Sequence, residues 1–144
     1  FTFEGFLPSR HSARLKSLER LRDEPRTLVF FESSHRIRDS LADLADVFGA
    51  RRPVAVCREM TKQFETVLRG SLEEVADRVD SDPDQRKGEF VVVVGGNAEP
   101  TEDRMADAMV LAKALLEFLP ASQAARVAAR LHGVSRRELY SALG

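Results

Sequence analysis

The sequence predicts an α/β domain over residues 1–97, followed by a small all-helical extension over residues 98–144. Two observations predict this division. Short apolar runs alternate with helical patterns as far as "EFVVVVGG" at 89–96, and no strand pattern follows the polar stretch "NAEPTED" at 97–103. We therefore expect the sheet to end before this stretch, and we interpret the stretch as a linker.

The composition limits the class of protein. Of the 144 residues, 43% are hydrophobic and 31% are charged, with a formal net charge of −1. The longest apolar runs fall well short of the ~20 residues that span a membrane. Cys57 is the single cysteine, which excludes an intrachain disulfide and fits a reducing compartment. We expect a cytoplasmic protein without membrane contact, and no metal site, because His35 has no neighbouring histidine.

The first half of the α/β domain begins with an alternating strand pattern at residues 1–6. A helix is expected over residues 9–23, ended by Pro25, and its five basic residues indicate a solvated face. "TLVFF" at 27–31 is an uninterrupted apolar run, which is typical of a buried central strand. Ser33 or Ser34 is expected to cap the next helix, which Gly49 ends. That helix has apolar residues at helical spacing: Ile37, Leu41, Leu44 and Phe48.

The second half continues the alternation. "PVAVC" at 53–57 and "TVLRG" at 66–70 are expected to be strands. "SLEE" at 71–74 is a capping box, in which Ser71 and Glu74 satisfy each other's backbone amides at the start of a helix that reaches about Val79. "SDPDQ" at 81–85 is a polar loop before the last strand.

The extension is expected to contain short helices. One runs from Met105 towards Pro120, and a second covers residues 124–131. After a turn at Gly133, "SRRE" at 135–138 is another capping box, with Val134 and Leu139 in the positions of a hydrophobic staple. Two short helices joined across "HGVS" are typical of a helix-turn-helix.

Charged side chains gather beside three of the predicted strands. "FFESSHR" at 30–36 and "CREMTKQFE" at 57–65 follow strands, and "KGEF" at 87–90 precedes one. Ligands of α/β proteins collect beyond the carboxyl ends of strands, so these segments are candidates for a binding cleft. The alternative, solvated charges on loops, stays open for each motif taken singly.

Taken in order, the motifs "FEGFLP", "TLVFFESSHR", "VFGARRPVAVCREMTKQFE", "GSLEE" and "KGEFVVVV" resemble the ribosomal RNA small subunit methyltransferase I family. The resemblance covers residues 1–97 densely, and the helical C-terminal part of that family covers the rest. It implies the C-terminal domain of a tetrapyrrole-methylase-like enzyme, with a mixed sheet and flanking helices. Ser34 departs from the family pattern, which usually has proline there.

The resemblance also implies an activity and a missing part. The family transfers a methyl group from S-adenosylmethionine to the ribose 2′-hydroxyl of a cytidine in the decoding region of 16S rRNA, within the small ribosomal subunit. The cofactor lies between two α/β domains, and the chain begins at Phe1. We therefore expect a fragment that lacks the N-terminal cofactor domain and is inactive alone, from an enzyme that forms a homodimer.

Site residues follow from this resemblance and from the chemistry of ribose methylation, which needs a positioned hydroxyl and a proton acceptor. The candidate catalytic residues are Glu32, His35, Glu59 and Glu65. The expected cofactor contacts are Phe31, Glu32, Thr66, Gly88 and Glu89. The expected RNA contacts are Arg36, Arg58, Lys62, Lys87, Arg136 and Arg137.

Two alternatives from other classes remain at this point. One is a nucleic-acid-binding module, in which "RVAARLHGVSRRELY" reads DNA through a recognition helix. The other keeps the tetrapyrrole-methylase fold with a small-molecule acceptor.

Overall fold

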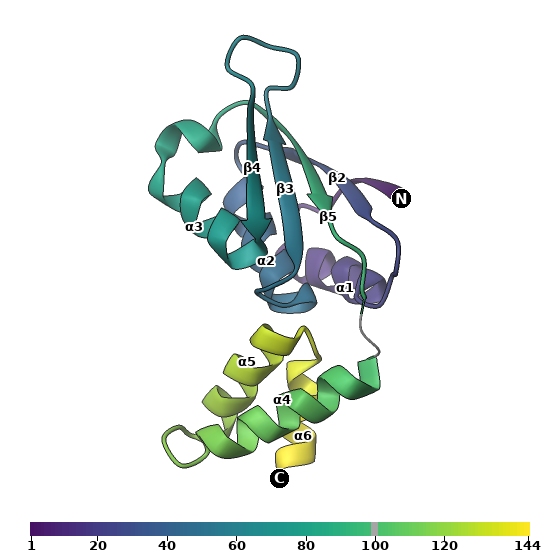
Figure 1. Ribbon diagram of the computed structural model, residues 1–144, viewed down its shortest axis with the longest axis vertical. Coiled ribbons are helices and arrows are strands. Elements are labelled where there is room, and N and C mark those ends of the chain that lie inside the picture. Colours follow the sequence, from purple (N-terminus) through teal and green to yellow (C-terminus); the bar gives the residue numbers. More distant parts are fainter. Residues whose placement is uncertain (99–100) are drawn as a thin grey trace.

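The computed structural model describes residues 1–98 and 101–144, and the side chains of 1–98 and 104–144. An α/β domain is followed by a unit of three helices (Figure 1). The second half of the predicted linker, from Thr101, already belongs to the first of these helices. Residues 99 and 100 of that linker lie outside the described residues.

The α/β domain is built on one mixed sheet, with strand order β1-β2-β5-β3-β4. β1 pairs in parallel with β2, and the other pairs are antiparallel, which confirms the predicted mixed sheet. The elements are β1 (Thr2–Phe6), α1 (His11–Leu21), β2 (Leu28–Ser33), α2 (Ile37–Phe48), β3 (Pro53–Arg58), β4 (Thr66–Ser71), α3 (Leu72–Ser81), the 3-10 helix η1 (Pro83–Arg86) and β5 (Glu89–Val94).

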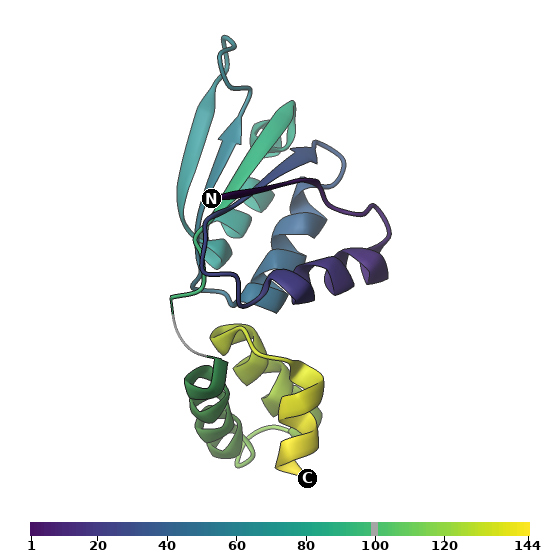
Figure 2. The same cartoon turned by 90° about the vertical axis from the view of Figure 1, so that its right-hand side faces the viewer.

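Helices α1, α2 and α3 pack against one face of the sheet (Figure 2). In β2, β3 and β5 every second residue points into this core, among them Phe30, Val56 and Val92, each at most 1% exposed. The residues between them, such as Phe31 and Val91, are exposed or half-buried on the opposite face. The uninterrupted apolar runs predicted strands that are buried on both faces of the sheet. Among the described residues, helices cover only one face of the sheet.

A buried ion pair joins α1 to α2. Arg14 Nε lies 2.6 Å from Asp43 Oδ2, and its guanidinium also donates to the Ser9 carbonyl. Arg14 is 4% exposed, so the prediction that the basic residues of this helix are solvated is wrong for Arg14. The amphipathic helix carries a basic residue on its inner side because Asp43 provides a buried partner there.

The helical unit consists of α4 (Thr101–Leu115), α5 (Ala121–His132) and α6 (Arg136–Leu143). Its core contains small side chains, which bring the helices close together: Ala108, Ala112, Ala128 and Ala129, with Val134 and Leu139. Both residues of the predicted staple are therefore buried. Ser135 accepts the Glu138 N–H, which is one bond of the predicted capping box.

Local boundaries differ from the expected ones in a few places. α1 is two residues shorter at each end than predicted, and α4 ends at Leu115, before the turn that precedes Pro120. The capping box at Ser71 and Glu74 is present with both bonds, and α3 extends to Ser81. The predicted polar loop contains η1, for which Asp82 caps the first turn.

Two glycines lie back to back where the helical unit meets the α/β domain. Gly49 ends α2 and Gly133 ends α5, with φ of +99° and +62°. A Cβ on Gly133 would lie 2.3 Å from the Phe48 carbonyl oxygen. The Ala50 N–H donates to the Arg130 carbonyl at 3.0 Å, and Arg130 lies near Asp46. Direct backbone contact therefore fixes the two parts against each other.

Gly133→Ala should lower the free energy of unfolding by about 2 kcal/mol or more, because alanine is strained at positive φ and its methyl group would overlap backbone atoms of α2. Urea denaturation measures the change. Gly95→Ala is the matched control, since its nearest non-bonded atoms would lie 3.5 Å away. Equal effects of the two substitutions would show that the glycine contact does not hold the units together.

Candidate functional site

One edge of the sheet gathers the polar residues that the sequence singled out. β1, β2 and β3 end at this edge, and β4 and β5 begin there, as the pairs Phe6 with Phe31 and Arg58 with Thr66 show. This is the upper edge in Figure 1, beside the long β3–β4 loop. The ends of all five strands therefore lie along one side of the sheet, together with the three segments that the sequence singled out.

Glu32, at the end of β2, is a buried carboxylate held by three donors. The Ser40 hydroxyl of α2 donates at 2.6 Å, the Ser33 N–H at 2.7 Å, and Arg36 Nε lies at 3.1 Å. The residue is 3% exposed. A buried charge with a full set of partners connects β2 to α2 through the turn between them.

The cap expected for α2 is wrong. The helix begins at Ile37, with Arg36 in the N-cap position and no side-chain cap bond there. The physical reason is a turn: a Ser33 cap would accept the Arg36 N–H, but this N–H donates to the Ser33 carbonyl instead. Glu32 holds the turn by accepting the Ser33 N–H. Ser33 and Ser34 instead line a pocket.

Arg36 and His35 lie in this turn between β2 and α2. The Arg36 guanidinium donates to the Leu7 carbonyl at 2.9 Å and lies 5.9 Å from the centre of the Phe6 ring. It thereby ties the β1 end to the turn. His35 is exposed, next to Ser34.

The upper apolar pocket lies on the open face of the sheet at this edge, with a volume of about 480 Å³. Phe31 forms one wall and makes edge-to-face contacts with Phe3 and Phe6, at ring-centre distances of 5.0 and 5.7 Å. The pocket is lined by Phe6, Phe31, Glu32, Ser33, Ser34, Met60, Gly88, Glu89, Phe90 and Val91. Its size and its aromatic lining with a few polar groups are typical of small-molecule sites.

The upper polar pocket adjoins it, has a volume of about 470 Å³, and shares Gly88 with it. It is lined by Arg58, Glu59, Phe64, Asp84, Lys87 and Gly88. An exposed aromatic ring beside cationic side chains is a combination that binds single-stranded nucleic acid. The two pockets therefore offer an apolar compartment and a compartment with charged groups of both signs, side by side.

Arg58 holds the base of the β3–β4 loop. Its guanidinium donates to Thr66 Oγ1 at 3.0 Å, to the Phe64 carbonyl at 3.0 Å and to the Lys87 carbonyl at 3.4 Å. Arg58 is 9% exposed, and Thr66 also donates to Gln85. Both side chains are engaged within the protein, so this part of the pocket wall is preorganised.

A charged cluster closes the other side of the loop. Glu59 accepts the Glu89 N–H at 2.7 Å, and Lys62 lies 3.3 Å from Glu59 and 2.9 Å from Glu89. The Glu89 N–H and then Lys62 lower the pKa of Glu59, while hydrogen bonds to Glu89 and Glu59 raise the pKa of Lys62. Both groups therefore keep their charges over a wide pH range.

Gly88 is required by this cluster. Its φ is +99°, and a Cβ there would lie 2.3 Å from a Glu59 carboxylate oxygen. Glu59 and Thr61 themselves have positive φ, at 53° and 66°. The loop therefore has a defined, turned backbone rather than an extended one.

The structure brings most of the predicted site residues to this edge. Phe31, Glu32, Gly88 and Glu89 line the upper apolar pocket, and Arg58, Glu59 and Lys87 line the upper polar pocket. Glu65 is exposed in the loop, where it accepts the Thr61 N–H at 2.6 Å. Arg136 and Arg137 are separate from this edge and line a pocket between the helical unit and α1, together with Ser122, Ser135, Tyr140 and Glu19 of α1.

Among the pocket residues that were missed, three are exposed apolar side chains. Phe6 ends the first strand beside Gly5, and Met60 and Phe64 lie in the β3–β4 loop. Phe6 and Phe64 are 60% and 68% exposed, so they are aromatic rings without the burial that a core position gives. An aromatic residue inside a charged loop is the signal that would have identified Phe64.

Three further observations concern metal ligands, membrane spans and the cysteine among the described residues. No group of three or more His, Cys, Asp or Glu side chains that could hold a metal ion occurs among them. None of the described helices combines the length and apolar character needed to cross a membrane. Burial raises the pKa of the Cys57 thiol, which opposes a nucleophilic role.

Comparison with protein families gives two matches that follow the structural division. The model for tetrapyrrole (corrin/porphyrin) methylases matches residues 1–76. The model described as the RsmI C-terminal HTH domain matches residues 102–143, which is the helical unit.

Curated relatives carry the name ribosomal RNA small subunit methyltransferase I. The Xylella fastidiosa protein is 48% identical over 140 residues, covering 97% of this chain and 51% of the relative. The Escherichia coli O157:H7 protein is 42% identical over 140 residues, covering 97% of this chain and 49% of the relative. The chain spans about half the length of the curated relatives it matches.

A solved structure shares the fold of the α/β part. The cobalamin biosynthetic enzyme cobalt precorrin-4 methyltransferase matches with a TM-score of 0.50 and 18% identity, covering 65% of this chain and 40% of that protein. The tetrapyrrole methylase fold is thus supported by sequence and by architecture.

Glu32→Gln should lower the free energy of unfolding by about 2 kcal/mol, because the amide cannot accept from Ser33, Ser40 and Arg36 together and leaves a cation without its partner. Urea denaturation of the chain measures this. Glu19→Gln, an exposed change on α1, is the control and should stay within about 0.5 kcal/mol of the original protein. An unchanged stability of Glu32→Gln would contradict a structural role for this carboxylate.

Proposed function

The chain belongs to the tetrapyrrole (corrin/porphyrin) methylase family, and we propose that it is the C-terminal half of a ribosomal RNA small subunit methyltransferase I. The reaction is methylation of the 2′-hydroxyl of a cytidine in the decoding region of 16S rRNA, in small ribosomal subunits in the cytoplasm. The observation that carries this proposal is the meeting at Gly88 of an apolar pocket and a charged pocket that holds Arg58 and Lys87.

The upper apolar pocket fits the nucleoside part of S-adenosylmethionine. Phe6, Phe31 and Val91 offer apolar surface for a flat ring, and Gly88 adds backbone to the wall, with the Glu59 side chain against its α-carbon. Ser33, Ser34 and Glu89 provide polar groups around it. When bound, the cofactor supplies an electrophilic methyl group. The N-terminal domain of the full-length protein would complete the site.

The upper polar pocket suits the RNA. Lys87 is 73% exposed on its side chain and pairs only at the surface with Asp84, so its ammonium group is available for a phosphate. Phe64 offers an exposed ring for stacking with a base. Arg58 supports this wall from inside, and Arg36 and Lys62 contribute positive charge at the same edge.

The four candidate proton acceptors differ in their surroundings. Glu32 is buried and fully bonded, Glu59 has a lowered pKa that makes it a weaker base, and Glu65 accepts a backbone amide. His35 is exposed beside Ser34, and imidazole is the most common general base in enzymes. We assign proton acceptance to His35, and to Glu32 the positioning of its turn.

A homodimer is part of the proposal. The middle of the open sheet face carries half-buried apolar side chains, Val29, Val93 and Ala55, which offer surface for a second subunit or for the N-terminal domain. Arg136 and Arg137, exposed in the first turn of α6, give the helical unit its own contact with RNA phosphates.

His35→Ala in the full-length protein should reduce turnover about 10²-fold, because the ribose hydroxyl loses its proton acceptor. The assay follows labelled methyl transfer from S-adenosylmethionine to small subunits that lack the modification, followed by digestion to nucleosides. The label should appear in 2′-O-methylcytidine. Cofactor affinity and thermal unfolding of the variant are the controls and should not change. Label in a base or in another nucleoside would reject the proposed reaction, and normal turnover would reject the role of His35.

Phe31→Ala and Lys87→Ala should separate the two pockets. Phe31→Ala removes an apolar wall and should weaken cofactor binding about tenfold while sparing RNA binding. Lys87→Ala removes a cation and should weaken RNA binding while sparing the cofactor. Calorimetry for the cofactor and filter binding for RNA, both on the full-length protein, measure these constants, and each variant is the control for the other. Parallel losses of both ligands in both variants would contradict the division into two compartments.

A further inference from the structure

We propose that Glu59 is a positioning residue of the methyl-transfer site, because its carboxylate fixes the backbone of Gly88 and Glu89 where the two upper pockets meet. The inference rests on the proposed function in taking methyl transfer as the reaction. In this role Glu59 acts through the backbone of another segment and accepts no proton from the substrate.

The contact takes the place of a bond between two strands. Arg58 and Phe90 are the last paired residues of β3 and β5 at the upper edge. Glu59 has a φ of 53°, so β3 turns away there, although the Glu59 N–H still donates to the Glu89 carbonyl at 2.9 Å. The Glu89 N–H donates to the Glu59 carboxylate at 2.7 Å instead of to a backbone carbonyl. Glu59 thus continues the sheet by one pair, and its side chain supplies the acceptor.

Glu59 also occupies the space beside Gly88. A Cβ on Gly88 would lie 2.3 Å from Glu59 Oε1 and 2.6 Å from Glu59 Cγ. Because residue 88 has no side chain, the carboxylate lies against the backbone and reaches the next N–H. Gly88 lines both upper pockets, whereas Glu59 lines the upper polar pocket. Glu59 therefore supports the peptide between the two pockets from the polar side.

Lys62 joins the β3–β4 loop to the same point. Its Nζ lies 2.9 Å from Glu89 Oε2 and 3.3 Å from Glu59 Oε1, and its N–H donates to the Glu59 carbonyl at 3.0 Å. The Glu89 side chain is 83% exposed, so solvent weakens its pair with Lys62. The Glu59 side chain is only 20% exposed. The bond from the Glu89 N–H to Glu59 is therefore the contact that holds this backbone.

A fixed backbone matters here because the reacting groups would come from different pockets. In the proposed function the methyl donor occupies the upper apolar pocket and the ribose approaches from the upper polar pocket, with Gly88 between them. Transfer needs the two reacting atoms about 3 to 3.5 Å apart, and a misplacement of about 1 Å costs about 10²-fold in rate. Loss of the Glu59 contact should therefore lower turnover more than it lowers affinity for either ligand.

Three substitutions of Glu59 separate positioning from proton acceptance. Glu59→Gln keeps an oxygen that accepts the Glu89 N–H but removes the basic carboxylate. Glu59→Asp keeps a carboxylate on a side chain that is one methylene too short for this bond, and Glu59→Ala removes the acceptor altogether. A proton acceptor would lose its activity in Glu59→Gln and keep part of it in Glu59→Asp. A positioning residue predicts the opposite order.

The first measurement is the rate of rRNA methylation by the full-length protein, with the assay used for His35→Ala. We expect kcat of Glu59→Gln to stay close to that of the original protein. In Glu59→Asp and Glu59→Ala, kcat should fall about 10²-fold. KM for S-adenosylmethionine and for the small subunit should change far less than kcat in all three variants.

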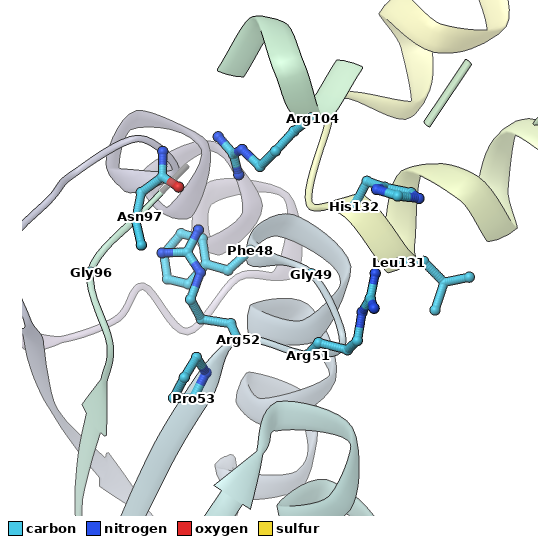
Figure 3. A pocket seen from close by; sticks show the side chains of 11 residues that line it. Phe48, Gly49, Arg51, Arg52, Pro53, Gly96, Asn97, Arg104, Leu131 and His132 are labelled. Carbon is cyan, nitrogen blue, oxygen red and sulfur yellow. The ribbon is translucent and has the colours of Figure 1, made fainter. Parts of the chain in front are cut away.

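Glu74 offers a matched control at the opposite end of the sheet. Its carboxylate accepts the Ser71 N–H at 2.8 Å, and a Cβ on Gly70 would lie 2.9 Å from it, so the contact resembles that of Glu59. Ser71 pairs with Pro53, and Figure 3 shows Pro53 at the pocket between the two units. Glu74→Ala should lower the thermal midpoint by roughly 3 °C, as loss of a helix cap does, and leave kcat unchanged.

The second measurement follows the backbone contact without any reaction. Amide hydrogen exchange of Glu89 is recorded by NMR in the full-length protein and its variants. The Glu89 N–H should be equally protected in the original protein, in Glu59→Gln and in Glu74→Ala. In Glu59→Asp and Glu59→Ala it should exchange about tenfold faster or more, because its acceptor is lost.

The outcomes separate this inference from the proposed function. Normal turnover of Glu59→Gln, with loss of turnover and of Glu89 protection in Glu59→Asp and Glu59→Ala, supports the positioning role. Loss of turnover in Glu59→Gln overturns it, as does normal turnover in Glu59→Ala, even if the original protein methylates rRNA. An equal loss in Glu59→Ala and Glu74→Ala also overturns it, because stability would then explain both. Absence of rRNA methylation by the original full-length protein refutes the proposed function, and this role of Glu59 with it.

Discussion

The buried carboxylate of Glu32 is the contact on which the functional edge depends. Its charge is stable in the interior only because Ser33, Ser40 and Arg36 donate to it, and these donors belong to the turn and to α2. Arg36 in turn reaches the Leu7 carbonyl after β1. One anion thus fixes the ends of β1 and β2 and the start of α2 relative to one another. Phe6, Phe31 and Ser33 of the upper apolar pocket are held in position by the same contacts.

The arrangement of layers explains why chemistry gathers at an edge. Helices cover one face of the sheet, so the side chains on that face are committed to packing (Figure 2). The strands end at the upper edge. There the Arg58 side chain donates to the Phe64 carbonyl of the β3–β4 loop, and the Glu59 carboxylate accepts the Glu89 N–H, so both side chains hold the loop in place. Gly88 is the shared point, because only a residue without a side chain leaves room for Glu59 at that backbone conformation.

The sequence predicted local features well and long-range ones poorly. The Ser71–Glu74 capping box and the Val134–Leu139 staple depend on residues a few positions apart, and both are present. The cap expected at Ser33 or Ser34 failed because the Arg36 N–H, which a Ser33 cap would accept, donates to the Ser33 carbonyl in a turn that Glu32 and Ser40 of α2 hold in place. Arg58 donates to the backbone carbonyls of Phe64 and Lys87. Every residue has a backbone carbonyl, so residue types in the sequence do not predict these contacts. The motif resemblance indicated the upper edge of the sheet, whereas the contact of Gly49 with Gly133 depends on how the two units meet.

The position of β5 has a consequence for how the protein is made. β5 is the last strand in chain order, yet it lies between β2 and β3, with Val94 opposite both Leu28 and Val54. Before Glu89–Val94 is synthesised, this sheet can form only a β1–β2 pair and a β3–β4 hairpin, with the place of β5 open between them. The sheet closes when β5 emerges, through contacts between residues far apart in sequence, and such closure is slow. The helical unit, built from neighbouring helices, folds by local contacts directly afterwards, and its docking onto Gly49 completes the order of assembly.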